Sequence, residues 1–198
     1  MCLEAMPDHR RRHFVGAVSS DGSAGERFDL PMLGRHDDLV AVAERFGIEV
    51  FCVGIGSNHV REHVTAELIA AGLAAVEVVS PHAVVLPTAQ LGEGCQLMPA
   101  AVVTSCASIG PGAIVNTNAS VDHDSIVGPY VHIGPGAVLG GRVTVGARTL
   151  IGLGVRVLPG VTIGADVTVG AGAVVVNDVP DGATVMGVPA RRRDRGVE

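Results

Sequence analysis

A histidine with a carboxylate on each side stands in the stretch from Asn116 to Asp124. The two neighbours of His123 are Asp122 and Asp124. A carboxylate close to an imidazole favours the protonated ring and raises its basicity, which suits a general base. Adjacent residues of a strand point to opposite faces, so the sequence alone leaves open whether either carboxylate touches the ring. An isolated histidine at a corner would more often be solvated surface.

The segments that must position this histidine follow a six-residue repeat. Every sixth residue from Leu91 to Val175 is Leu, Ile or Val, and glycine often follows it. A strict period of six fits neither a helix nor a plain strand, and it is typical of short strands joined by corners. Three corners close a coil of eighteen residues, so the stretch from Leu91 to Pro180 predicts a parallel β-helix of five coils. The spacing does not give the hand of the helix.

The coil period relates further residues to the histidine. Gly141 is eighteen residues beyond His123 and would lie on the same edge, one coil away. A residue without a side chain there would let an acyl group approach and would offer its N–H to a developing oxyanion. A corner glycine needed only for its backbone is an equal alternative. His132 is half a coil from His123, so the two histidines could meet only across an interface between chains.

Composition and charge narrow the class of protein. Aromatic residues are 3% of the chain and Trp is absent, so the core must be aliphatic. A net charge of −6 argues against a general nucleic-acid binder. We find no stretch that could span a bilayer and no visible signal peptide, which favours the cytoplasm. The four cysteines (Cys2, Cys52, Cys95 and Cys106) lack CxxC spacing, and we expect Cys95 to be buried and inert.

The chain before the rod alternates between strand and helix patterns. Predicted strands are residues 14–18, 48–55 and 75–79, and predicted helices are residues 37–46 and 59–71. This alternation predicts a small Rossmann-like α/β domain. We therefore divide the chain into an acceptor-binding domain (1–80), a β-helix domain (81–180) and a C-terminal tail (181–198).

A glycine-rich turn separates the second predicted strand from the second predicted helix. It contains Gly56, Ser57 and Asn58, and either of the last two could cap the helix. Exposed N–H groups at a helix start can bind phosphate, which makes these residues candidates for binding a nucleotide-linked substrate. A turn that merely connects two elements is an equal alternative. Asp21 and Asp37 could contact a ribose or a sugar, although loop carboxylates are usually only solvated.

The rod, the string NTNASVDHDSIVGPYVHIGPGAVLGG and the ending VMGVPAR resemble the sugar O- and N-acetyltransferases. This family includes sialic acid O-acetyltransferases and the UDP-4-amino-sugar N-acetyltransferases of bacillosamine synthesis. The similarity runs over about residues 14–191 and is most specific in the string around the histidine. It implies a left-handed β-helix, a homotrimer, and acetyl-CoA bound between adjacent rods.

The same resemblance implies a role for each matching residue. The catalytic group would be His123 as general base, Asp124 raising its basicity, Asn116 as a polar neighbour, and Gly141 as backbone oxyanion donor. Contacts to acetyl-CoA would come from His132, Gly141, Leu153 and Ala171, and Gly56 would contact a nucleotide sugar. The acetyl group would pass directly to a sugar amine or hydroxyl, without a metal and without a protein nucleophile.

The chain also departs from the family pattern. Family members begin with a strand and a Gly-rich loop containing a His, whereas Met1–Met6 reads as a helix already under way. We expect either a true start further upstream, which we favour, or a real loss of that segment. Ser19-Ser20 replaces an Asp pair of the nucleotide-sugar members, which leaves the acceptor and O- versus N-acetylation open. The alternatives are a non-catalytic scaffold trimer and, less favoured, a zinc carbonic anhydrase, whose histidines should recur at the coil period.

Overall fold

The computed structural model describes residues 14–19, 30–35 and 38–193. Several expectations fall outside these ranges. They concern Met1–Met6, Cys2, Ser20, Asp21 and Asp37. No helix in the described part of the chain is long and apolar enough to cross a membrane.

The N-terminal part consists of short elements. Strands β1 (Ala17–Val18) and β2 (Met32–Gly34) pair in parallel, as do β3 (Val50–Phe51) and β4 (Ala74–Ala75). Helix α3 spans Leu39–Phe46 and ends at Gly47, whose left-handed φ of 62° suits a residue without a side chain. Helix α4 spans Asn58–Ala70. Both predicted helices are confirmed, whereas the predicted strand 48–55 shortens to the two residues of β3.

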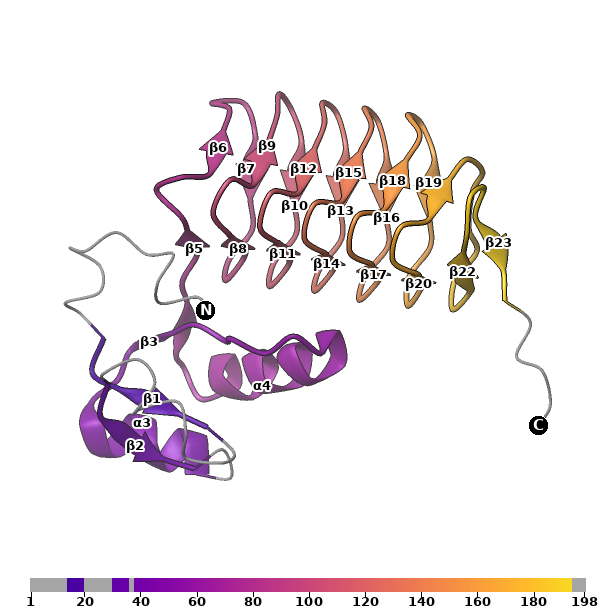
Figure 1. Cartoon of the computed structure of the whole chain (residues 1–198). Helices are drawn as coiled ribbons and strands as arrows, with labels where there is room; N and C mark the ends of the chain where they lie inside the picture. Colours follow the sequence, from indigo (N-terminus) through magenta and orange to yellow (C-terminus); the bar gives the residue numbers. More distant parts are fainter. Residues whose placement is uncertain (1–13, 20–29, 36–37, 194–198) are drawn as a thin grey trace, which may run out of the picture.

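The rod contains three parallel sheets within the described residues (Figure 1). One sheet holds β7 (Gln90–Leu91), β10 (Ser108–Ile109), β13 (Ile126–Val127), β16 (Thr144–Val145) and β19 (Thr162–Ile163). The second holds β6 (Val84–Val85), β9 (Val102–Val103), β12 (Ser120–Val121), β15 (Val138–Leu139), β18 (Arg156–Val157) and β21 (Val174–Val175). The third, the docking sheet, holds β5 (Val78–Val79), β8 (Gln96–Leu97), β11 (Ile114–Val115), β14 (His132–Ile133), β17 (Leu150–Ile151), β20 (Thr168–Val169) and β22 (Thr184–Met186), with β23 (Arg191–Arg192) added antiparallel at its end.

The register confirms the predicted coil. Ser108 pairs with Ile126 and Ile109 with Val127, so residues eighteen apart lie side by side in successive coils. The repeated aliphatics point inward, and Ile109, Ile133 and Ile151 are at most 1% exposed. They form one continuous core along the rod, in which each coil buries its aliphatics only against its neighbours. This arrangement is a left-handed parallel β-helix.

Polar residues inside this core are paired. Ser125 and Thr149 occupy inward positions that elsewhere hold alanine, valine or cysteine, and both are fully buried. The Ser125 hydroxyl donates to Gly140 O at 3.1 Å, and the Thr149 hydroxyl donates to Gly164 O at 2.7 Å. Each hydroxyl also accepts an N–H from the next coil, so its burial leaves no polar group unsatisfied. Cys95 is also fully buried, and burial raises its pKa to about 12, as expected of an inert thiol.

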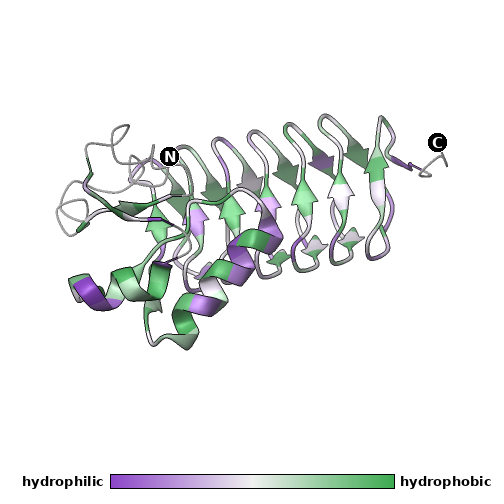
Figure 2. Ribbon diagram, turned by 90° about the horizontal axis from the view of Figure 1, so that it is seen from below, coloured by the Kyte–Doolittle hydropathy of each residue, from purple (hydrophilic) through white to green (hydrophobic). Residues whose placement is uncertain are grey.

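The rod begins earlier in the chain than the predicted boundary at residue 81. The predicted strand 75–79 divides into β4, which pairs with β3, and β5, which already pairs with β8 of the rod. The first coil therefore starts at Val78 and not at the predicted residue 81. Helix α4 lies along the docking sheet, close to β8, β11 and β14 (Figure 1). Its surface alternates between polar and apolar residues in the view from below the rod (Figure 2).

Candidate active site

The corner between β12 and β13 brings His123 and Asp124 together. Asp124 has a left-handed φ of 58°, which turns its side chain toward the ring beside it. The distance from His123 Nδ1 to Asp124 Oδ2 is 2.8 Å. The contact left open by the sequence is therefore made, because a corner does not alternate its side chains as a strand does. With Nδ1–H donating to the carboxylate, Nε2 is the ring atom left to accept a proton.

The Asp122 side chain stabilises the same corner by bonding its backbone. Its Oδ1 accepts the His123 N–H at 2.8 Å and the hydroxyl of Thr104, one coil earlier, at 3.1 Å. The side chains of His123 and Asp124 are 49% and 55% exposed, so this edge of the rod is open to a substrate.

Gly141 lies directly over the imidazole, as the coil period predicts. A Cβ added to Gly141 would lie 2.6 Å from His123 Cε1 and would also collide with Nε2. The φ of Gly141 is not in the left-handed region, so the glycine is required for space and not for its backbone conformation. Among the hydrogen bonds of the described residues, the Gly141 N–H donates to no acceptor. His123 Nε2 and the Gly141 N–H therefore lie side by side on the same edge of the rod.

A second group of candidates gathers on the docking sheet. Asn116 Nδ2 lies 3.0 Å from His132 Nε2. The Asn116 Oδ1 atom accepts the Thr117 N–H at 2.7 Å, which fixes the orientation of the amide. His132 Nε2 must therefore accept the bond from Asn116, and the neutral ring carries its proton on Nδ1. Burial lowers the pKa of His132, a backbone hydrogen bond with Gly56 opposes this, and the charge of Arg61 lowers the pKa further.

The two groups do not meet within one chain. His123 and Gly141 lie on the edge between the sheets of β12 and β13, whereas Asn116 and His132 belong to the docking sheet. The expectation that Asn116 neighbours the catalytic histidine is therefore not met inside a single chain. The structure instead places Asn116 beside His132 and the Gly56 loop.

Leu153 and Ala171 lie on the edge between the docking sheet and the sheet that contains β12. They are one coil apart, where β17 leads into β18 and β20 into β21, and both are exposed. The Gly172 N–H donates to Leu153 O at 2.8 Å, which confirms that these corners stack.

The glycine-rich turn is only partly available to a ligand. Ser57 has an extended conformation at the N-cap of α4 without a side-chain capping bond, and both Gly56 and Ser57 are exposed. The Asn58 side chain is buried, and its Nδ2 donates to Arg148 O at 2.8 Å and Thr149 O at 3.2 Å. Asn58 therefore docks the domain on the rod, while Gly56 and Ser57 face outward.

Sequence reasoning missed Arg61, which is buried between α4 and the rod. Its partners in the rod, Gly112 O and Tyr130 O, are backbone carbonyls, so no residue type in the sequence marks them. The described residues contain no group of three or more His, Cys, Asp or Glu side chains placed to hold a metal ion.

Comparison with known proteins identifies the family. Residues 106–141 match the family model of the bacterial transferase hexapeptide (six repeats). PerB from Caulobacter crescentus, solved with CoA and GDP-perosamine, is 40% identical with a TM-score of 0.85; the match covers 89% of this chain and 84% of PerB. The chain belongs to the hexapeptide-repeat sugar acetyltransferases.

Two further structures agree with this assignment. A histidine-to-asparagine mutant of perosamine N-acetyltransferase from the same organism, also with CoA and GDP-perosamine, is 41% identical, with a TM-score of 0.81 over 83% of this chain and 78% of that one. The acetyltransferase domain of PglB from Neisseria gonorrhoeae, in complex with acetyl coenzyme A, is 34% identical, with a TM-score of 0.80 over 95% of this chain and 84% of that one. Membership of the sugar acetyltransferases confirms the predicted β-helix and the predicted acyltransferase class.

Proposed function

We propose that this protein transfers the acetyl group of acetyl-CoA to the amino group of a nucleotide-linked sugar. The observation that carries the proposal is the His123 imidazole, bonded to Asp124 on one side and covered by Gly141 on the other. The relatives support both substrates, because PerB was solved with CoA and GDP-perosamine and PglB with acetyl coenzyme A. An amino sugar as acceptor makes N-acetylation the favoured reaction.

In the proposed reaction, His123 Nε2 removes a proton from the sugar amine as the nitrogen attacks the thioester carbonyl. A C–N bond forms, and the carbonyl oxygen becomes an oxyanion that accepts the Gly141 N–H. The C–S bond then breaks, and the proton held on Nε2 passes to the leaving thiolate. Asp124 holds Nδ1–H throughout and stabilises the imidazolium that forms between the two proton transfers.

We further propose that the working unit is a homotrimer with a shared site. One chain supplies His123, Asp124 and Gly141, and the adjacent chain supplies Asn116, His132 and the Gly56 loop. This arrangement is supported by the position of the two groups on different faces of one rod. Outward aliphatic side chains such as Ile126, which is 55% exposed, provide apolar surface for packing between rods. Acetyl-CoA would lie between adjacent rods, near Leu153 and Ala171.

An acceptor panel tests the proposed activity. Release of the CoA thiol would be measured with acetyl-CoA and one of four acceptors: GDP-perosamine, a UDP-linked 4-amino sugar, a free amino sugar or a sialic acid. We expect thiol release and a mass increase of one acetyl group only with a nucleotide-linked amino sugar. Thiol release without an acetylated product, or acetylation of the sialic acid alone, would contradict the proposal.

A further inference from the structure

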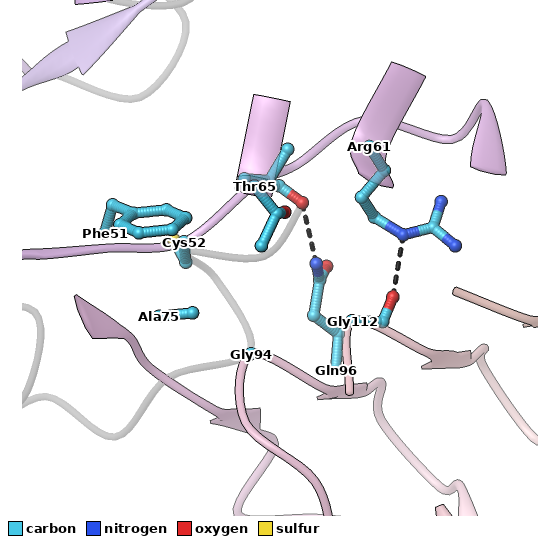
Figure 3. Close-up of a pocket in the computed structure, with 9 residues that line it drawn as sticks. Phe51, Cys52, Arg61, Thr65, Ala75, Gly94, Gln96 and Gly112 are labelled. Carbon is cyan, nitrogen blue, oxygen red and sulfur yellow. Dashed lines mark hydrogen bonds between the residues drawn. The ribbon is translucent and has the colours of Figure 1, made fainter. Parts of the chain in front are cut away.

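Arg61 is a fully buried cation whose bonds join the N-terminal domain to the rod. Its side chain extends from α4, and the residue is 1% exposed. Nε donates to Gly112 O at 2.7 Å (Figure 3). Nη2 donates to Tyr130 O at 2.8 Å, and the two carbonyls lie in successive coils of the rod. The planar guanidinium therefore spans two coils at once, which a lysine ammonium could not do.

The remaining donors of Arg61 hold the glycine-rich turn. Nη1 donates to Ile55 O at 2.9 Å and to Gly56 O at 3.3 Å. Nη2 also donates to Asn58 Oδ1 at 2.9 Å. Five acceptors thus match the five N–H groups of the guanidinium, and none of these five acceptors is charged. Burying a cation is costly unless such bonds compensate, so this arrangement holds the turn firmly against the rod.

The space around Arg61 is too small for a ligand. A cavity of about 10 Å³ lies beside it, lined also by Thr65, Gln96 and Gly112 (Figure 3). Gln96 Nε2 donates to Val53 O at 2.7 Å on the far side of this cavity. Such a cavity holds at most about one water molecule. Arg61 therefore cannot touch a sugar or a nucleotide and can act only through the turn that it holds.

The glycine-rich turn lies beside His132, and Asn116 lies on the other side of the same imidazole. The Gly56 backbone lies close enough to His132 to affect its pKa, and His132 Nε2 accepts from Asn116. A continuous series of neighbouring groups therefore runs from Arg61 through Gly56 and His132 to Asn116.

We propose that Arg61 is a positioning residue for the acceptor site, which fixes the exposed Gly56–Ser57 backbone at the level of His132 and Asn116. This inference rests on the proposed function, in which the turn meets the nucleotide part of the acceptor. Loss of the guanidinium should release the turn and weaken acceptor binding, while the His123 edge and the acetyl-CoA candidates Gly141, Leu153 and Ala171, which lie away from the turn, keep their geometry.

The test compares Arg61→Met with a matched control, Arg148→Ala. Arg148 of the rod also contacts α4, through Glu62 at 3.3 Å, and it pairs with Asp166 of the next coil at 2.8 Å, but its side chain does not bond the turn. For Arg61→Met we expect KM for GDP-perosamine or the UDP-linked 4-amino sugar to rise roughly tenfold or more, because several charge-assisted hydrogen bonds to the turn are lost. KM for acetyl-CoA should stay within about threefold in both variants, and Arg148→Ala should leave the acceptor KM within the same range. Equal changes in both KM values, or the same acceptor KM in both variants, would overturn the proposal.

Nitrogen-15 NMR of the wild-type protein supplies a test that needs neither a folded variant nor a substrate. If the turn lies against His132 as proposed, the neutral ring faces the Gly56 backbone with Nδ1 and carries its proton on that atom. A proton on Nε2 would show that the turn is not held in this way. Because this measurement involves no acetyl transfer, it judges the anchoring even if the acceptor panel disproves the proposed activity.

Discussion

At the level of single residues, the candidate site depends on how one imidazole is enclosed. Asp124 accepts a hydrogen bond from Nδ1–H of His123, and the missing side chain of Gly141 leaves room beside Nε2. The left-handed backbone of Asp124 brings its carboxylate to the ring, and the coil period places Gly141 over the ring. Each can be changed separately.

Replacing His123 by alanine removes the proposed base. We expect kcat to fall by roughly 10²–10⁴-fold, the usual contribution of general base catalysis, with KM for acetyl-CoA little changed. Asp124→Asn should act in the same direction but more weakly, because Nε2 is retained. The exposed His63 on α4 provides the control, and His63→Ala should keep the wild-type rate. A His123→Ala enzyme with more than about a third of the wild-type rate would exclude the assigned role.

Adding one methyl group at Gly141 tests the space above the ring. In Gly141→Ala the new Cβ meets the imidazole and must push it aside. Because a displacement of about 1 Å can cost about 10²-fold, we expect a loss of that order in kcat. The ring is half exposed and can move outward, so thermal melting should change little. A wild-type rate in this variant would show that the imidazole position is not important.

At the level of elements, the sequence predicted the rod well and the N-terminal part less well. The hexads could be recognised because every coil repeats the same inward position, from Leu91 to Val175. The short strand β3 could not be bounded, because residues 48–55 are apolar throughout and nothing in their pattern marks where pairing stops. The docking by Arg61 could not be predicted either, because its acceptors in the rod are main-chain carbonyls, which every residue type provides.

The hexad core can be tested within a single strand. In β19, Ile163 is fully buried and its neighbour Thr162 is exposed. Ile163→Ala should lower the free energy of unfolding by about 2–5 kcal/mol, through lost apolar burial and the cavity left behind. Thr162→Ala, on the same strand, should stay within about 0.5 kcal/mol. Urea unfolding at one fixed protein concentration provides the comparison, and equal effects would contradict the inward assignment of Ile163.

At the level of the whole molecule, the proposed active site combines two groups of residues that one chain holds apart. Asn116 and His132 lie on the docking sheet, on a different face of the rod from His123. In the proposed trimer, the docking sheet of one rod approaches the His123 edge of another. Cyclic symmetry with three copies makes this contact three times.

Light scattering should give a mass of about three times the 20.1 kDa of one chain. This mass should persist on dilution to the concentrations used for activity measurements. A stable monomer with full activity would contradict the shared site.

Mixed trimers test which residues come from which chain. His123→Ala and His132→Ala chains should each be poorly active alone. Unfolded together and refolded at equal amounts, they should recover about a quarter of the wild-type activity, because each mixed trimer then holds one intact site. The control pairs His123→Ala with Gly141→Ala, which damage the same half of the site and should not recover. Recovery in the control, or none in the first mixture, would assign the residues differently.

Because residues eighteen apart stack on one another, the position of a residue in the sequence determines which edge or face of the rod it occupies. An inserted segment of eighteen residues would lengthen the rod by one coil and return every later side chain to its own edge, as the pairing of Ser108 with Ile126 illustrates. An insertion of six residues would keep every aliphatic inward and would preserve the hexad rule. It would nevertheless rotate everything after it by one edge, so that an insertion between His123 and Gly141 would separate the base from its oxyanion donor. Stability in this fold therefore has a period of six residues, whereas the assembly of the site has a period of eighteen.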